Sequence, residues 1–259
     1  MKFMIQHNLI NPDHLLEVQL AIEKFPHEFV GVIPFGHEIT SDEPIVGTDY
    51  IPYGSTLFTT LTHELGWKGS YFDLDKFNYR AFLGSRDDML NSNVMTIEDA
   101  MAFLKTVPED SEWFTRPSLD LKQYVGMVET AGELLAWFKD ATEFTGSGCY
   151  KIEEGTDIVL CKPVNIQAEY RWFVVGGKVI SGSMYRYRGN LFKQRCIEPD
   201  IIAEAQRFAD KWLPHDNCCM DLALVNDQVK VVEFNCINSS GFYDNDVEAI
   251  FKAIWEYHL

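Results

Sequence analysis

The sequence predicts an α+β protein in which a small α/β domain comes before an antiparallel α+β body. Three observations support this fold class. Strand-like and helix-like segments alternate over residues 1–85, which indicates a mostly parallel sheet. Two hairpin signals follow, at Gly176-Gly177 and at Asn226-Asp227. An amphipathic pattern over 200–213 predicts a helix between these two hairpins.

The first 85 residues supply the α/β domain. Helices are expected at 11–25, with Asn11 as N-cap and Pro12 in the first turn, and at 54–67. Strands are expected at 2–10, 28–35 and 45–53. Ser55 or Thr56 at the start of the second helix could bind an anion, although an ordinary N-cap is the more common role. Later segments predict strands at 113–117 and 155–164 and a helix at 132–142.

The first hairpin turns at Gly176-Gly177. A two-residue turn would pair Val175 with Lys178, Arg171 with Gly182, and Gln167 with Arg186. Side chains alternate along a strand, so Glu169, Arg171 and Arg186 should share one face. Guanidinium groups on such a face suit phosphate or carboxylate oxygens.

The second hairpin carries acidic and amide side chains within "MDLALVNDQVKVVEFN". A three-residue loop over 226–228 would pair Val225 with Val229 and Asp221 with Glu233, and Asn235 would share the face of Glu233. Opposed carboxylates with Cβ atoms about 5 Å apart repel each other. A bridging Mg²⁺ would offset that repulsion. The alternative is a strand end in solvent, with the carboxylates apart or the register shifted by one residue.

Composition limits the function classes. The chain of 259 residues is 46% hydrophobic and 24% charged, as in globular proteins. It contains no long apolar run and no pattern of a signal peptide, so we expect no membrane span and a cytoplasmic location. The six cysteines lack the spacing of a zinc site and are expected to be reduced.

The charge is unevenly distributed. The net charge of −17 makes a stable nucleic-acid complex unlikely as a function. The segment from Lys162 to Arg195 nevertheless holds seven basic residues and a single acidic one, Glu169. Such a segment suits a small polyanion, and a solvated basic face is an equally good interpretation. Arginines and a carboxylate cluster together suit a magnesium-bound nucleoside triphosphate.

Both hairpins resemble those of the ATP-grasp superfamily. The segment "IQAEYRWFVVGGKVISGSMYR" is similar to the arginine-bearing strand pair of RimK-like ligases, and "CCMDLALVNDQVKVVEFNCINSSG" is similar to their metal-binding hairpin. The sequence most resembles small ATP-grasp proteins common in bacteriophage genomes, which share "GSTLF", "RP…K" and "NSSGFY". This resemblance implies a pre-ATP-grasp domain at 1–88 and an ATP-grasp domain at 89–259. The latter would have α+β subdomains at about 110–164 and about 165–259.

The resemblance also implies roles for individual residues. Asp221, Glu233 and Asn235 match the Mg²⁺ ligands. Arg171 and Arg186 match arginines that contact phosphates of ATP or of an acyl phosphate. The expected nucleotide contacts are Arg116, where most members have lysine, Lys122, and, in the adenine linker, Cys161, Lys162 and Val164. Glu169 would orient Arg171, bind an amine or form a structural ion pair. Asn238, Ser239 and Ser240 would bind substrate or form a plain turn.

The implied activity is ligation of a carboxylate to an amine. The resemblance implies ATP and two Mg²⁺ ions, which Mn²⁺ could replace. These would serve the formation of an acyl phosphate, from which the amine then displaces phosphate to give an amide. The carboxylate would belong to a small molecule or a peptide. Two alternatives remain open at this stage. One is an inactive ATP-grasp protein that binds a nucleotide or a partner, and the other is a kinase that uses the same site.

Overall fold

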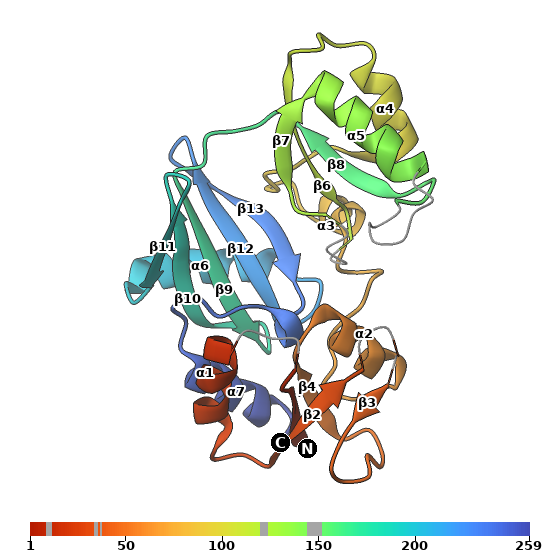
Figure 1. Ribbon diagram of the computed structural model, residues 1–259. Coiled ribbons are helices and arrows are strands. Elements are labelled where there is room, and N and C mark those ends of the chain that lie inside the picture. The colour runs from red at the N-terminus through yellow and green to blue at the C-terminus, as the bar shows by residue number, and fades with distance from the viewer. Residues whose placement is uncertain (9–11, 34–35, 37, 120–123, 144–151) are drawn as a thin grey trace. The chain divides into compact units, whose positions relative to one another are not determined.

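The computed structural model describes residues 1–8, 12–33, 36, 38–119, 124–143 and 152–259 (Figure 1). The chain forms two compact units. The first contains residues 1–76 and 166–259, and the second contains residues 77–165. Among the described residues, none of the helices is both long and apolar enough to cross a membrane.

The N-terminal part of the first unit is the expected α/β arrangement. Its sheet has the order β3-β2-β1-β4, and β1 pairs in parallel with both β2 and β4. The strands are β1 (Lys2–Gln6), β2 (His27–Val32), β3 (Ile39–Thr40) and β4 (Tyr50–Tyr53), and the helices are α1 (Pro12–Ile22) and α2 (Thr56–Glu64). The short antiparallel strand β3 was not predicted. The Ser55 hydroxyl caps α2 by accepting a hydrogen bond from the Phe58 amide, while the expected cap Asn11 lies outside the described residues.

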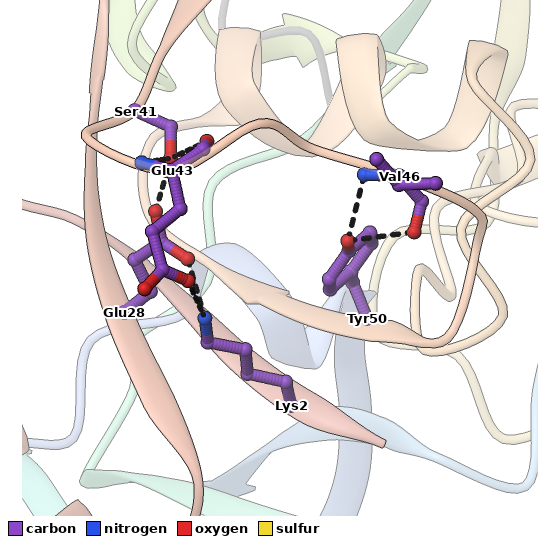
Figure 2. Close-up of polar contacts among 6 residues, drawn as sticks. All are labelled: Lys2, Glu28, Ser41, Glu43, Val46 and Tyr50. Atoms are coloured by element: carbon purple, nitrogen blue, oxygen red, sulfur yellow. Dashed lines mark hydrogen bonds and ion pairs between the residues drawn. The ribbon is translucent and has the colours of Figure 1, made fainter.

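Polar contacts fix the loop between β3 and β4, so β4 begins at Tyr50 and not at residue 45 as expected (Figure 2). Lys2 of β1 donates to Glu28 of β2 at 2.6 Å and to Glu43 of the loop at 3.3 Å. The Ser41 hydroxyl bonds to Glu28 and donates to the Glu43 carbonyl. The Tyr50 hydroxyl both accepts from the amide and donates to the carbonyl of Val46.

The C-terminal part of the first unit is a five-stranded antiparallel sheet of order β11-β10-β9-β12-β13. Its strands are β9 (Ala168–Val175), β10 (Lys178–Tyr187), β11 (Asn190–Arg195), β12 (Cys218–Val225) and β13 (Gln228–Asn235). Its helices are α6 (Pro199–Lys211), the 3₁₀ turn η1 (Ile237–Ser239) and α7 (Val247–Tyr257). Phe3 and Ile5 of β1 share one core with Phe173 of β9 and Phe251 of α7. This shared core explains why the two parts form one compact unit.

The β9–β10 hairpin keeps the predicted turn but not the predicted register. Val175 pairs with Lys178, and both turn glycines have positive φ. Two irregularities in β10 then shift the pairing, so Arg171 faces Ser183 and Glu169 faces Arg186. The predicted pairs of Arg171 with Gly182 and Gln167 with Arg186 are therefore wrong. Each bulge adds an unpaired residue to one strand and moves every later partner along it.

The β12–β13 hairpin reaches the predicted carboxylate pair by a different route. Its turn has two residues, Asn226 and Asp227, both with positive φ, so Val225 pairs with Gln228 instead of Val229. A bulge follows between Asp221 and Leu222, and it restores the pairing of Asp221 with Glu233. The predicted loop length is wrong, and the predicted opposition of the two carboxylates is confirmed.

The second unit is an antiparallel sheet of order β5-β8-β6-β7 with its own core. The strands are β5 (Val94–Thr96), β6 (Glu112–Pro117), β7 (Met127–Thr130) and β8 (Asp157–Cys161), and the helices are α3 (Tyr79–Ser85), α4 (Ile97–Leu104) and α5 (Ala131–Glu143). The unit begins at Phe77, whereas the sequence interpretation places a boundary after residue 88. Local contacts explain the difference, because the Tyr79 amide donates to the Ser118 carbonyl and Arg80 forms an ion pair with Asp157.

Candidate functional site

Asp221 is the centre of the candidate site. It lies on β12 between β9 and β13, opposite Arg171 on one side and Glu233 on the other. Both oxygens of the Asp221 carboxylate accept from Arg171, Oδ1 from Nε at 2.9 Å and Oδ2 from Nη2 at 2.7 Å. The Asp221 side chain is only 1% exposed. A paired fork of this kind fixes both the position and the orientation of the carboxylate.

The electrostatics of Asp221 favour a nearby cation. Burial raises the pKa of Asp221, and the neighbouring charges of Glu233 and Glu169 raise it further, while Arg171 opposes the shift. A buried carboxylate next to other carboxylates needs positive charge to remain ionised. Arg171 supplies one such charge inside the fold.

Glu233 and Asn235 complete an oxygen-rich set with Asp221. Glu233 is partly exposed on β13, and the Asn235 amide nitrogen donates to Asp221 Oδ2 at 3.3 Å. Within the described residues there is no group of three His, Cys, Asp or Glu side chains that could hold a metal ion. Two carboxylates and an amide are nevertheless the ligand types that Mg²⁺ takes, usually with substrate oxygens and water completing its shell. The donor chemistry of the three residues therefore fits Mg²⁺.

The two predicted arginines have different surroundings. The Arg171 side chain is 11% exposed and is committed to Asp221, whereas the Arg186 side chain is 53% exposed. The Arg186 Nη1 atom donates to Glu169 Oε1 at 3.2 Å. Arg186 is therefore open to solvent, whereas Arg171 is largely enclosed. Contact of either arginine with a phosphate stays a prediction.

Glu169 forms an ion pair, which is one of the roles considered from the sequence. Its Oε2 atom accepts from the Tyr185 hydroxyl at 3.0 Å while Oε1 accepts from Arg186. Glu169 is buried, and these two hydrogen bonds give each of its carboxylate oxygens a partner within the protein. This arrangement links β9 to the bulged part of β10. A direct contact of Glu169 with an amine stays a prediction.

Two tyrosines of the site were not identified from the sequence. The rings of Tyr185 and Tyr243 stack with centroids 4.6 Å apart and planes 9° apart. The Arg171 guanidinium lies 5.2 Å from the Tyr243 ring centroid and 5.9 Å from that of Tyr185. Tyr243 follows Gly241 and Phe242 in "NSSGFY", and this aromatic end of the loop is the signal that could have indicated it.

The loop that follows the carboxylate hairpin is held by internal hydrogen bonds. The Asn238 side chain donates to the carbonyls of Pro52 and Gly69 and accepts from the Tyr71 amide. Ser240 is also buried, and its hydroxyl donates to the Cys236 carbonyl at 2.8 Å. Ser239 is partly exposed. The contacts of Asn238 and Ser240 favour the turn interpretation, and substrate binding by these three residues stays a prediction.

The remaining predicted residues belong to the second unit. The Arg116 guanidinium lies 5.2 Å from the ring centroid of Tyr79. Lys162 Nζ lies 3.8 Å from the ring centroid of Trp113 and donates to the Glu112 carbonyl. Cys161 is partly exposed at the end of β8, and Val164 is exposed. Lys122 lies outside the described residues.

Comparison with known families identifies the domain. The family described as "ATP-grasp domain, R2K clade family 3" matches residues 65–254. The chain belongs to this ATP-grasp family. The match includes both hairpins that carry the resemblance, so the sequence-based prediction of the superfamily is confirmed. A search of curated proteins gives no match.

Solved structures show the same fold along the whole chain. The D-cycloserine synthetase DcsG is 12% identical with a TM-score of 0.61, and the similarity covers 99% of each chain. A RimK domain ATP-grasp protein from Sphaerobacter thermophilus is 12% identical with a TM-score of 0.61, covering 98% of this chain and 100% of that one. The D-alanyl-alanine synthetase A of Vibrio cholerae is 12% identical with a TM-score of 0.58, covering 99% and 93%. At this identity the likeness establishes the ATP-grasp fold.

Proposed function

We propose that this R2K ATP-grasp protein is an ATP-dependent ligase that joins a carboxylate to an amine through an acyl phosphate. The observation that carries the proposal is the buried Asp221, which pairs with Arg171 on one strand and faces Glu233 on the other. Opposed carboxylates on neighbouring strands are unfavourable unless a cation lies between or beside them. The names of the structural relatives, two synthetases among them, support a ligase in particular.

Asp221, Glu233 and Asn235 would hold two Mg²⁺ ions, which Mn²⁺ could replace. The bound metal would neutralise negative charge on the β- and γ-phosphates of ATP. One structural relative, the ATP-grasp ligase PsnB, is seen with Mg and ADP bound, which supports this assignment. Arg171 keeps the Asp221 carboxylate in a single orientation. Binding of ATP and metal therefore does not have to lower the conformational entropy of this side chain.

The chemistry then requires little of the protein besides position and charge. An oxygen of the substrate carboxylate attacks the γ-phosphorus of ATP, and ADP leaves. The amine next attacks the acyl carbon, and inorganic phosphate leaves as the amide forms. Arg186, with its exposed guanidinium, would contact the transferred phosphoryl group and stabilise the charge that develops on it.

The second unit would contribute nucleotide contacts. Arg116 and Lys122 are proposed to bind phosphate oxygens, and the segment with Cys161, Lys162 and Val164 to contact adenine. The Lys162 ammonium lies over the Trp113 ring and donates to the Glu112 carbonyl. These two contacts fix its position. The carboxylate substrate is proposed to be a small molecule or a peptide, with an amine acceptor.

Calorimetric titration of ATP tests the metal part of this proposal. Wild-type protein should bind ATP with Mg²⁺ at least tenfold more tightly than without it, and Glu233→Ala should lose this dependence on metal. The matched control is Glu256→Ala, because Glu256 is an exposed acidic residue of helix α7. ATP binding that is equal with and without Mg²⁺, or unchanged in Glu233→Ala, would contradict the proposal.

Product analysis tests the reaction. Wild-type protein mixed with Mg-ATP, amino acids and peptides should release ADP and phosphate and form an amide that mass spectrometry detects. A phosphorylated product without an amide would indicate a kinase. Metal-dependent ATP binding with no turnover on any carboxylate offered would indicate a nucleotide-binding protein without catalytic activity.

A further inference from the structure

Tyr243 has an unusual backbone conformation for its residue type. Its φ is +56°, in the left-handed region where bulky side chains are rare and cost conformational energy. The other residues described with positive φ outside glycine are Arg188, Asn226 and Asp227, and Asn226 and Asp227 form the hairpin turn that favours such angles. Tyr243 lies instead next to the candidate site. Residues with strained backbone conformations cluster at functional sites.

Contacts on both sides hold this conformation. Phe242, the preceding residue, is buried and stacks on Tyr53 and Phe173. On the other side, the Asn245 amide and side chain both donate to the Phe242 carbonyl. Arg195 donates to both the carboxylate and the carbonyl of Asp244. The residues around Tyr243 are thus fixed independently of its ring.

The Tyr243 ring lies against the guanidinium of Arg171. The Tyr243 ring stacks almost parallel on Tyr185, and the Arg171 guanidinium lies beside this pair, 5.2 Å from the Tyr243 centroid and 5.9 Å from that of Tyr185. The edge of the same guanidinium is bound by Asp221 through two hydrogen bonds. Arg171 Nη1 lies 3.4 Å from the Gly241 carbonyl, two residues before Tyr243. The guanidinium is therefore enclosed by a carboxylate, two aromatic rings and a loop carbonyl.

We propose that Tyr243 is a positioning residue, whose ring fixes Arg171 and through it the Asp221 carboxylate. The left-handed backbone at Tyr243 places the ring of this loop residue beside the guanidinium. The part of the proposal that concerns activity rests on the ligase function proposed above. The parts that concern strain and the order of Arg171 do not depend on it.

The strain is tested by comparing two variants that both remove the ring. Alanine at position 243 keeps a Cβ atom and its steric cost at positive φ, and glycine removes that cost. The melting temperature of Tyr243→Gly should exceed that of Tyr243→Ala by about 2–4 °C. Equal melting temperatures, or a lower one for glycine, would show that the left-handed backbone is not strained.

The positioning role is tested on Arg171 directly, in metal-free protein. The Arg171 Nε–H signal in a proton–nitrogen NMR spectrum, assigned by its loss in Arg171→Lys, should be sharp and slow to exchange with water. Tyr243→Phe keeps the ring and should preserve the signal. Tyr243→Ala and Tyr243→Gly should speed its exchange about tenfold or more. An unchanged signal in the alanine and glycine variants would overturn the proposal.

Activity provides the last comparison. The kcat for ADP release should fall about tenfold to a hundredfold in the alanine and glycine variants and recover in Tyr243→Phe, with a smaller change in the KM for ATP. If Tyr243→Phe loses activity while the Arg171 signal is intact, the Tyr243 hydroxyl acts in catalysis directly, and positioning by the ring does not account for the effect on activity. If wild-type protein shows no turnover, the ligase proposal fails, and the NMR and melting comparisons still decide the role of Tyr243.

Discussion

Arg171 and Arg186 look alike in the sequence but differ in what surrounds them. Arg171 is only 11% exposed and makes two hydrogen bonds to the buried Asp221, and Arg186 makes one to Glu169 from a largely exposed position. Removing one member of a buried ion pair leaves an uncompensated charge, whereas a pair with one exposed member contributes less because solvent screens it. Substitution of Arg171 should therefore mainly lower stability, and substitution of Arg186 should mainly lower activity.

We predict that Arg171→Met lowers the free energy of unfolding by about 3–5 kcal/mol, because Asp221 is left buried without its counter-charge. Arg186→Met should lower it by less, about 1–2 kcal/mol, because the buried Glu169 loses one partner but keeps its hydrogen bond from the Tyr185 hydroxyl. Urea denaturation of both variants checks this difference. Under the ligase proposal, Arg186→Met should nevertheless lose turnover. Equal destabilisation by the two substitutions would show that the burial of Arg171 does not matter energetically.

His215 predicts a dependence of stability on pH. Burial lowers the pKa of His215, and the charge of Lys76 lowers it further against the opposing Asp216 and Asp73. Its Nδ1 atom accepts from the Asn217 amide at 2.9 Å, so the folded protein favours the neutral ring. The unfolded chain then binds more protons as the pH falls below about 6.5. Stability should therefore decrease between pH 7.5 and 5.5 and be insensitive to this group above that window.

The measurement is the urea midpoint at pH 7.5 and at pH 5.5 for wild type and His215→Asn. Asparagine retains an oxygen that can accept from the Asn217 amide but does not titrate. The loss of stability on acidification should be smaller in the variant. His14 and His258, whose pKa values burial also lowers, contribute equally to both proteins and cancel in the comparison. An identical pH dependence in the two proteins would exclude His215 as a contributor.

At the scale of the elements, β10 decides how the candidate site is assembled. Its two irregularities move Arg186 opposite Glu169 and allow Tyr185 to reach the same carboxylate. Gly182 lies between these irregularities and packs against the buried ring of Trp172 on β9. Close packing at this glycine keeps β10 in register beside β9.

We predict that Gly182→Ala is more destabilising than Gly177→Ala. A Cβ atom at Gly182 would lie 2.1 Å from ring carbons of Trp172, so β9 and β10 would have to separate, at a cost of about 3 kcal/mol. A Cβ atom at Gly177 meets nothing within 4 Å, and only its positive φ of 74° opposes alanine, by about 1 kcal/mol. Thermal melts of the two variants provide the comparison. The reverse order would contradict the packing argument.

At the scale of the whole molecule, the two compact units differ in how the chain builds them. The second unit is continuous in sequence and has its own core, which includes Leu134, Phe138 and Ile158. The first unit needs both ends of the chain, because Phe3 and Ile5 pack with Phe173 and Phe251. Folding of the first unit must therefore bring together residues far apart in the sequence.

We predict that a fragment of residues 77–165 folds by itself and unfolds cooperatively on heating, as followed by circular dichroism. A fragment of residues 166–259 should not, because removal of residues 1–76 exposes the apolar face around Phe173. This second fragment is the matched control. Loss of structure in the 77–165 fragment would show that its core needs the first unit.

The sequence by itself determined the fold class, the superfamily and the opposed carboxylates of β12 and β13. These depend on local patterns, namely strand alternation, turn residues and a short motif around Glu233 and Asn235. The predicted pairing of Asp221 with Glu233 is right although the predicted turn is one residue too long. The shorter turn and the bulge shift the register in opposite directions and cancel. Such compensation cannot be read from propensities, since a bulge depends on packing against neighbouring strands.

Only the tertiary structure decided the surroundings of these residues. Arg171 faces Asp221 because β9 and β12 are neighbours, and no short connection in the chain implies that order. The same strand order buries one arginine and leaves the other exposed, although both lie in one basic segment. Tyr243 reaches Arg171 through a left-handed backbone that contacts with distant residues impose. Local sequence fixes which side chains share a strand face, and non-local packing fixes which of them meet.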